Sequence, residues 1–163
     1  FRGVIRMGSC PKDPEVGDAA PVGAPSDLSS AYKGRMALVV GGTRGIGAAI
    51  AQTLREAGAA VTIVGRSAAP GVVGGAFAAD LSTVKGCRQL VADMVEAGVN
   101  GYDYLIFTVG AWPDFTDWAT ADGVEKVVAL DLLARHVVLE QLVAAGLLRS
   151  GARGLNVLAS SQQ

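Results

Sequence analysis

Apolar and polar positions follow two different periods along this chain. Short continuous apolar runs, typical of buried β-strands, recur from residue 36 onward and are separated by segments with helical spacing. The runs predicted to be strands are Met36–Val40, Ala60–Gly65, Gly75–Asp80, Tyr104–Val109 and Gly154–Leu158. This alternation predicts an α/β fold, with a parallel sheet and helices on both of its faces.

Three of the intervening segments are predicted to be helices. The first follows the opening strand and stops at Gly58. The second is expected to be capped by Ser82 and to run to about Ala97. The third is predicted over about residues 121–145, where apolar side chains occur on nearly all sides.

Two segments show neither an apolar run typical of a strand nor helical spacing of apolar residues. Residues 8–34 are rich in Pro, Gly, Ser, Asp and Ala, so residues 1–34 are expected to be a mostly irregular leader. The domain is then expected over residues 35–163. Between Arg66 and Gly75 the chain is too short and too rich in Gly and Pro for a full helix, so a loop or a single turn is predicted there.

The composition fits one domain of this class. The 163 residues are 50% hydrophobic, and the mean hydropathy is +0.38, which suits buried parallel strands. The net charge of −1 gives no electrostatic case for nucleic acid or an anionic membrane. Cys10 and Cys87 show no metal-ligand spacing and are expected to be free thiols in a reducing compartment, the cytoplasm. Two arginines in residues 1–7 leave organelle targeting open.

The most specific signal is the turn after the first strand, where residues 39–47 read Val-Val-Gly-Gly-Thr-Arg-Gly-Ile-Gly. Gly41 allows a sharp turn, Gly45 lets phosphates approach the backbone, and Gly47 lets a helix pack closely on the sheet. The free N–H groups of the helix start then face an anion. Glycine clusters also mark ordinary loops, but the strand and helix on either side favour a pyrophosphate site.

The end of the second strand indicates which dinucleotide is bound. An NAD site of this type usually has Asp or Glu there to bind the ribose hydroxyls. Here the chain reads Gly65-Arg66-Ser67, and Arg44 adds a second positive charge nearby. Because a guanidinium attracts a 2′-phosphate, the two arginines favour NADP over NAD. The alternative is that both are solvated surface side chains.

Asp80 follows the third predicted strand and has two compatible interpretations. At the carboxyl end of a strand it could bind the amino group of adenine. It could equally form a turn or a helix cap.

Together these motifs, with Asp-Tyr-Leu-Ile-Phe-Thr-Val-Gly at residues 103–110, resemble the short-chain dehydrogenase/reductase family over about residues 34–160. The resemblance implies a Rossmann-type doubly wound sheet of strand order 3-2-1-4-5, and hydride transfer between NADP(H) and a small carbonyl or alcohol substrate. The C-terminal part of the usual fold is expected to be missing. The cofactor-binding residues implied are Gly41, Thr43, Arg44, Gly45, Ile46, Gly47, Arg66, Ser67, Asp80, Leu81, Thr108, Val109 and Gly110.

The chain departs from the family pattern at its catalytic positions. Phe107-Thr108-Val109-Gly110 replaces the usual Asn-Asn-Ala-Gly. The resemblance places Asp131 at the family's catalytic asparagine, where an acid could still hold water or could be a plain helix residue. It places either Ala159, in strict register, or Ser160, after a shift of one residue, at the serine that polarises the substrate carbonyl.

The family's Tyr-x-x-x-Lys pair is not present in this chain. Lysine at that spacing lowers the pKa of the tyrosine, which exchanges the proton as hydride moves. Tyr32, Tyr102 and Tyr104 have no lysine four residues later. The chain is therefore expected to be either a fragment of an NADP-dependent oxidoreductase or a degenerate member. The alternatives are a non-catalytic dinucleotide-binding module and an inactive fragment.

Each of three further features allows two interpretations. His136 lies in the long apolar helix, where a structural or interface role is favoured over catalysis. Trp112 and Trp118 either line a pocket or cover the core. The long helix at 121–145 suggests burial on two sides, and the resemblance implies that it forms a homodimer interface.

Overall fold

Five parallel strands form one sheet with the order β3-β2-β1-β4-β5, as predicted. The computed structural model describes residues 28–67, 75–112 and 116–158. The strands are β1 (Met36–Val40), β2 (Ala60–Gly65), β3 (Ala76–Ala78), β4 (Tyr102–Phe107) and β5 (Leu148–Asn156). The helical elements are α1 (Leu28–Tyr32), α2 (Gly45–Glu56), α3 (Val84–Glu96), α4 (Lys126–Val128), the π-helical turn η1 (Ala129–Leu133) and α5 (Ala134–Ala144).

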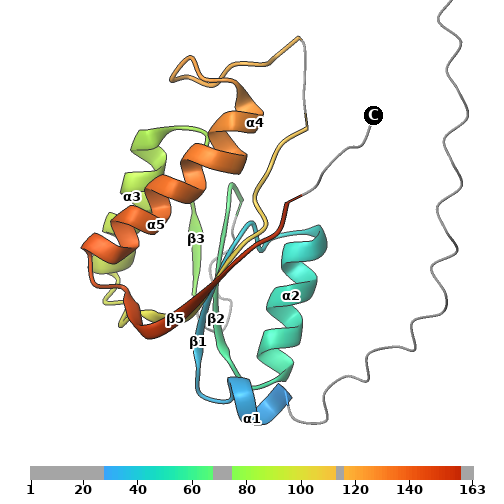
Figure 1. The fold of residues 1–163 in the computed structure, drawn as a ribbon, viewed down its shortest axis with the longest axis vertical. Helices are drawn as coiled ribbons and strands as arrows, with labels where there is room; N and C mark the ends of the chain where they lie inside the picture. Colours follow the sequence, from blue (N-terminus) through green and yellow to red (C-terminus); the bar gives the residue numbers. More distant parts are fainter. Residues whose placement is uncertain (1–27, 68–74, 113–115, 159–163) are drawn as a thin grey trace, which may run out of the picture.

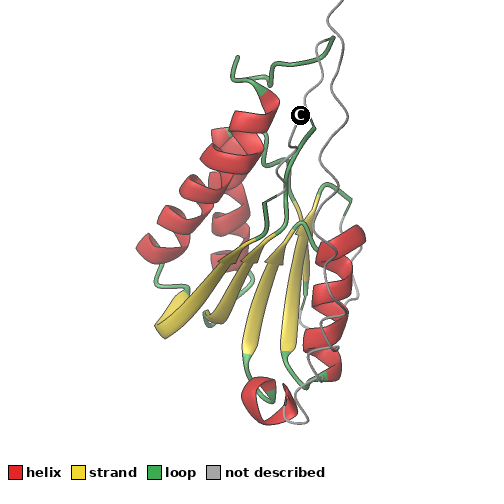
Figure 2. Cartoon of the chain, turned by 45° about the vertical axis from the view of Figure 1, so that its right-hand side comes forward, coloured by secondary structure: helices red, strands yellow, loops and turns green. Residues whose placement is uncertain are grey.

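Helices cover both faces of the sheet (Figures 1 and 2). Helix α2 lies on one face, whereas α3 and α5 lie side by side on the other. The strands alternate accordingly, since successive side chains point to opposite faces. Ala37 and Val39 of β1 pack in the cluster that includes α2. Leu38 and Val40 pack in the larger cluster, which includes residues of α3 and α5.

The last three strands differ from their predicted bounds. β3 is shorter, because it covers Ala76–Ala78 where Gly75–Asp80 was predicted. β4 starts and ends two residues earlier than predicted, because the N–H groups of Thr108 and Val109 both donate to Val40 O, at 2.8 and 3.1 Å, in place of the regular ladder. β5 starts at Leu148, six residues before the predicted strand. Residues 148–153 of this strand, Leu-Arg-Ser-Gly-Ala-Arg, have no apolar run, and only Leu148 and Arg153 among them are in register with β4 in the described sheet.

The predicted helix at 121–145 begins too early. Thr120 and Gly123 form a turn, with a Gly123 N–H to Thr120 O bond of 2.9 Å, and Ala119 forms a bridge with Glu125. Glu125 then caps α4, because its carboxylate accepts from the N–H groups of Val127 and Val128 at 3.0 and 2.8 Å. The helical region therefore runs from Lys126 to Ala144 and contains η1.

One smaller prediction is also corrected. The N-cap of α3 is Thr83 and not Ser82, since Thr83 Oγ1 accepts from Gly86 N at 3.0 Å. The predicted leader contains helix α1, and Gly34 just after it donates to Gly58 O at 3.0 Å. The rest of the leader and most of the predicted loop at 66–75 lie outside the described residues. No helix within the described ranges is long and apolar enough to cross a membrane.

Asp103 joins three segments at the amino-terminal edge of the sheet. Its carboxylate accepts from Met36 N at 2.8 Å, from Arg149 at 2.9 Å and from Arg35 at 3.2 Å. Its side chain is 13% exposed, whereas both arginines are much more exposed. The hydrogen bond from Met36 and the charge of Arg149 lower the pKa of Asp103, outweighing the effect of its burial.

Asp103→Asn should therefore destabilise the fold by about 1 kcal/mol at pH 7, because the exposed ion pairs contribute little beyond the hydrogen bond. A lowered folded-state pKa stabilises the fold above the unfolded value of about 4, and this contribution is lost as the pH falls through the folded-state pKa. Urea denaturation of both proteins across pH should show the difference vanishing in acid. Glu140→Gln, at an exposed position of α5, is the control and should change stability little. A difference between Asp103→Asn and wild type that is independent of pH would contradict this account.

Candidate functional site

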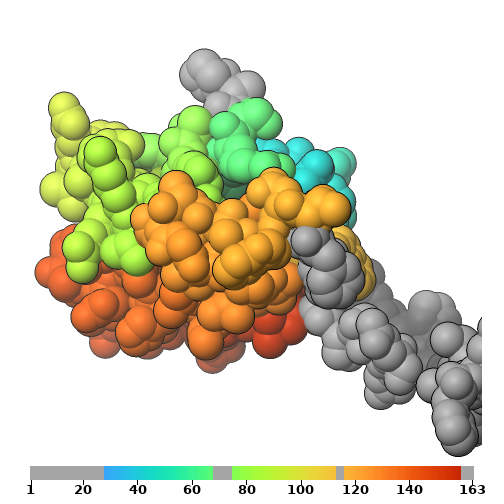
Figure 3. Space-filling view, turned by 90° about the horizontal axis from the view of Figure 1, so that it is seen from above, coloured from blue at the N-terminus to red at the C-terminus, as the bar shows by residue number. Residues whose placement is uncertain are grey.

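A cavity of about 840 Å³ opens at the carboxyl ends of the strands. Loops that follow β1, β2, β3 and β4 line it, together with the start of the α4–η1 helix. Its lining residues include Gly41, Thr43, Arg44, Gly45, Ile46, Gly47, Arg66, Asp80, Leu81, Thr108, Val109 and Gly110. Figure 3 looks onto this end of the molecule, where the orange segment before α4 lies against the green residues that follow β3. Every predicted cofactor-binding residue except Ser67 lines this one cavity.

The glycine turn fits closely against the end of β4. Gly41 has a φ of +95°, and a β-carbon there would lie 2.6 Å from Thr108 Oγ1 and 2.7 Å from Val109 N. A β-carbon on Gly47 would collide with Gly41 O and Thr108 Oγ1. The space that a side chain would fill is thus already occupied by backbone and by Thr108, whose hydroxyl donates to Val40 O at 3.2 Å. Only glycine allows this turn and helix to approach so closely.

The first turn of α2 offers backbone donors to the cavity. Arg44 is its N-cap residue, and no side chain caps the helix. The first intrahelical bond that follows joins Ala48 N to Arg44 O at 3.3 Å, so the preceding N–H groups of the helix have no intrahelical partner. A β-carbon at Gly45 would meet nothing within 4 Å. This arrangement of open space and free donors suits an anionic group such as a phosphate.

Two arginines and one carboxylate flank the far end of this cavity. Arg44 and Arg66 are both exposed and both line it, and Arg66 directly follows β2. Asp80 Oδ1 accepts from Ser82 N at 3.0 Å, which confirms the predicted turn. Hydrogen bonds from the Ser82 side chain and backbone, with a smaller effect of the Arg66 charge, lower the pKa of Asp80. Asp80 is therefore ionised at neutral pH, and its role toward adenine stays a prediction.

The opposite end of the cavity combines β4 with η1. A β-carbon on Gly110 would lie 2.7 Å from Asp131 Oδ1, so Asp131 lies directly against the chain that follows β4. Trp112 lines the cavity and is 71% exposed. Trp118 is 54% exposed and does not line it, so neither tryptophan covers the core. Ser160, the other predicted catalytic residue, and Ala159 lie outside the described residues.

The sequence interpretation missed Arg135 on α5, which is 8% exposed. Its guanidinium donates to Val109 O at 2.6 Å, to Val157 O at 3.0 Å, and to the side chains of Asp131 at 3.2 Å and Asn156 at 3.3 Å. The sequence signal was a charged residue in an apolar helix, with an aspartate four positions earlier. Lys126 and Leu130 are further lining residues that were not predicted.

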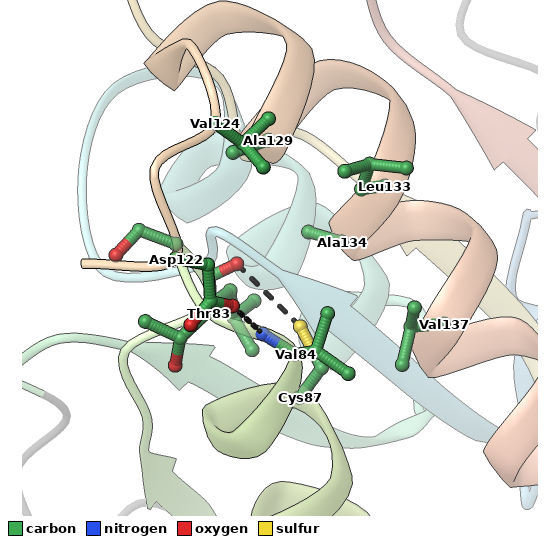
Figure 4. Close-up of a pocket in the computed structure, with 11 residues that line it drawn as sticks. Thr83, Val84, Cys87, Asp122, Val124, Ala129, Leu133, Ala134 and Val137 are labelled. Atoms are coloured by element: carbon green, nitrogen blue, oxygen red, sulfur yellow. Dashed lines mark hydrogen bonds between the residues drawn. The ribbon is translucent and has the colours of Figure 1, made fainter. Parts of the chain in front are cut away.

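A second, much smaller cavity of about 40 Å³ lies between α3 and the α4–α5 region (Figure 4). Asp122 Oδ2 accepts from Val84 N at 2.8 Å at its edge, and Cys87 Sγ donates to Leu81 O at 3.5 Å. Burial, with the nearby charges of Asp80 and Asp122, raises the pKa of the Cys87 thiol to about 11. Cys87 is thus a free but unreactive structural thiol, and Cys10 lies outside the described residues.

The strand order and the glycine turn after β1 define a Rossmann-type α/β protein. The family model for short chain dehydrogenases matches residues 35–163. The chain belongs to this family, whose members bind a nicotinamide dinucleotide and act as oxidoreductases.

Individual relatives agree with this assignment. A 3-oxoacyl-[acyl-carrier-protein] reductase of rhamnolipid biosynthesis from Pseudomonas aeruginosa is 37% identical over 134 residues, which are 76% of this chain and 51% of that protein. An uncharacterized oxidoreductase of Saccharomyces cerevisiae is 32% identical over 103 residues, 61% of this chain and 33% of that protein. The chain thus spans between a third and about half of the length of these relatives.

Similar solved structures also support membership of this family. The Pseudomonas aeruginosa RhlG/NADP active-site complex has a TM-score of 0.62 and 32% identity, over 80% of this chain and 59% of that one. A short-chain dehydrogenase/reductase from Serratia marcescens has a TM-score of 0.59 and 29% identity, over 77% and 57%. An NADH-dependent reductase responsible for alginate metabolism has a TM-score of 0.58 and 26% identity, over 76% and 55%.

Proposed function

We propose that this chain is the cofactor-binding part of an NADP-dependent oxidoreductase that interconverts a small carbonyl compound and its alcohol. The observation that carries the proposal is the pair Arg44 and Arg66, which both line the cavity where β2 ends without a carboxylate. An NAD site of this type has an acidic residue at that position, which would repel a 2′-phosphate. Two guanidinium groups attract it instead.

The relatives support this proposal only in part. One neighbour is an NADP complex and another is NADH-dependent, so the fold alone does not select the cofactor. The selection must come from residues at the end of β2, where this chain has Gly65-Arg66-Ser67. Asp80 lines the same cavity, but its carboxylate already accepts the Ser82 N–H at 3.0 Å. The name of the Pseudomonas aeruginosa reductase, which acts on a 3-oxoacyl group, supports a carbonyl substrate.

In this proposal the bound cofactor supplies the hydride, and the chain binds and orients it. The first turn of α2 and Gly45 hold the pyrophosphate, and Arg44 and Arg66, with Ser67, hold the 2′-phosphate. Thr108, Val109 and Gly110 lie along the nicotinamide-side ribose. The role of Ser160 toward the substrate carbonyl stays a prediction. A role of Asp131 toward water also stays a prediction, because Asp131 is ion-paired with Arg135 and does not line the cavity.

Fluorescence titration of the chain with NADPH and with NADH tests the proposal. NADPH is expected to bind about 100-fold more tightly, which corresponds to about 2.7 kcal/mol from the contacts of the two arginines with the 2′-phosphate. Raising the salt concentration should weaken NADPH binding more than NADH binding, because exposed charges are screened. Absence of binding for both cofactors would refute the dinucleotide site, and tighter NADH binding would refute the role of the arginines.

A specific observation favours the alternative of a non-catalytic dinucleotide-binding module. The three tyrosines of the chain do not line the cavity. Tyr102 is fully buried, and the rings of Tyr32 and Tyr104 contact each other at an interplanar angle of 57°, with their centroids 5.0 Å apart. No tyrosine of this chain is therefore in position to exchange a proton with a substrate. Carbonyl reduction by the chain alone would exclude this alternative.

The proposal includes a homodimer formed through the α4–α5 region. The side of the helix that points away from the core carries Val128, Leu132, Leu139 and Val143, which are 43% to 62% exposed. These positions recur at helical spacing and form one apolar stripe, with the exposed His136 in its middle. In a symmetric dimer, the same apolar stripe of a second copy would pack against this stripe.

Replacing Leu132 by Glu is expected to convert the dimer to a monomer. A charge in the centre of an apolar interface should cost roughly 2 kcal/mol or more, so the dimer would dissociate about 30-fold more readily. Sedimentation velocity over a range of concentrations measures the change. Val95→Glu, at an exposed apolar position on α3, is the matched control and should remain dimeric. A wild-type chain that sediments as a monomer at all concentrations would contradict the dimer.

A further inference from the structure

Arg135 is a buried cation that connects three elements at the nicotinamide end of the cavity. Its guanidinium bonds to the chain after β4 through Val109 O and to the end of β5 through Asn156 Oδ1 and Val157 O. It also forms an ion pair with Asp131 on η1, and the Arg135 side chain is 9% exposed. A buried charge is costly unless hydrogen bonds and an opposite charge offset it. These four partners offset that cost through the two terminal amino groups, whereas the buried Nε of Arg135 has no hydrogen-bond partner among the described residues.

The cavity wall lies directly on these contacts. Val109 and Gly110 line the cavity, whereas Arg135 and Asp131 do not. Asp131 Oδ1 lies against Gly110 on the side of η1. Arg135 therefore fixes the wall from behind and touches nothing inside the cavity.

The hydrogen bond from Arg135 to Val109 O fixes the orientation of the peptide between Val109 and Gly110. A trans peptide points its C=O and its N–H in opposite directions, and no cis peptide occurs in the described chain. Because Arg135 holds Val109 O at 2.6 Å, the N–H of Gly110 points away from the guanidinium. Since Gly110 lines the cavity and Arg135 does not, the cavity is the side available to this N–H.

We propose that Arg135 is a positioning residue that presents the Gly110 N–H to the nicotinamide–ribose half of the cofactor and keeps Asp131 ion-paired. The inference rests on the proposed function, because it assigns that half of the cavity to the nicotinamide. It predicts that Arg135 affects only one half of the cofactor. The adenosine half, held by α2, Arg44 and Arg66, is independent of it.

The test compares NADPH with adenosine 2′,5′-bisphosphate, which lacks the nicotinamide half. Arg135→Met keeps the length of the side chain but removes its donors. It should weaken NADPH binding about tenfold, while the bisphosphate dissociation constant changes less than about twofold. The emission of bound NADPH should shift toward that of free NADPH. Arg135→Lys, whose ammonium cannot span both strand ends, should show the same effect at smaller size.

Bisphosphate binding also reports whether each variant is folded. If Arg135→Met fails to fold, Arg135→Lys decides between the outcomes. Arg88→Met, at an exposed position on α3, is the control and should match the wild type for both ligands. Folded variants that bind NADPH like the wild type, or that lose both ligands equally, would overturn the inference. A wild-type chain that binds neither ligand would overturn the proposed function instead.

Discussion

Replacing Arg44 and Arg66 together by glutamine should weaken NADPH binding about 100-fold and leave NADH binding within about threefold of the wild type. Each charge-assisted contact to the 2′-phosphate is expected to contribute about 1.5 kcal/mol, or roughly tenfold in affinity. Both side chains are exposed and line the cavity, so their replacement leaves the core intact. The variant should lose its preference for NADPH.

Calorimetric or fluorescence titrations of the wild type, both single variants and the double variant measure this effect. Arg88→Gln removes one exposed positive charge on α3 and serves as the control for net charge. An equal loss of NADPH and NADH affinity would mean that the arginines hold the pyrophosphate and do not select the cofactor. Unchanged NADPH affinity would mean that they are ordinary surface side chains.

Gly47→Ala should both destabilise the fold and abolish cofactor binding. The added β-carbon would collide with Gly41 O and Thr108 Oγ1. Neither atom can move freely, because Gly41 N is bonded to Val64 O at 2.8 Å and Thr108 Oγ1 to Val40 O at 3.2 Å. The cost is expected to be about 3 kcal/mol, the upper part of the range for overpacking. Relief of the collision would displace α2 and with it the phosphate-binding turn.

Urea denaturation and NADPH titration of the same variant measure these two effects. The control is Gly154→Ala on β5, where a β-carbon would meet nothing within 4 Å and φ is not in the left-handed region. It should change stability by no more than about 0.5 kcal/mol. A Gly47→Ala protein as stable as the wild type would show that the close packing of the turn is not required.

The sequence predicted the features that depend on neighbouring residues. The apolar runs of β1 and β2 and the glycine turn between β1 and α2 are local patterns, so the strand positions and the cavity wall around Gly41 and Gly47 could be predicted. The predicted start of the long helix at residue 121 was wrong, and the cause of this error is also local. Glu125 caps the helix through its own carboxylate, and glutamate is not a typical N-cap residue.

Features that depend on contacts between distant residues could not be predicted. The carbonyl partners of Arg135 lie 26 and 22 residues away in the sequence, on the chain after β4 and β5. The first part of β5 carries polar residues such as Arg149, and its register with β4 includes Leu148 and Arg153 on either side of an irregularity. In both cases the fold brings together groups whose relation has no period or spacing in the sequence.

The most direct test of the central claim is an NMR titration of the chain with NADP⁺. The largest amide shifts are expected at Gly45, Gly47 and Arg66, because these residues line the proposed phosphate sites. Shifts that centre instead on Tyr32 and Ile50, in the apolar groove between α1 and α2, or no shifts at saturating ligand, would contradict the assignment of this cavity to a dinucleotide.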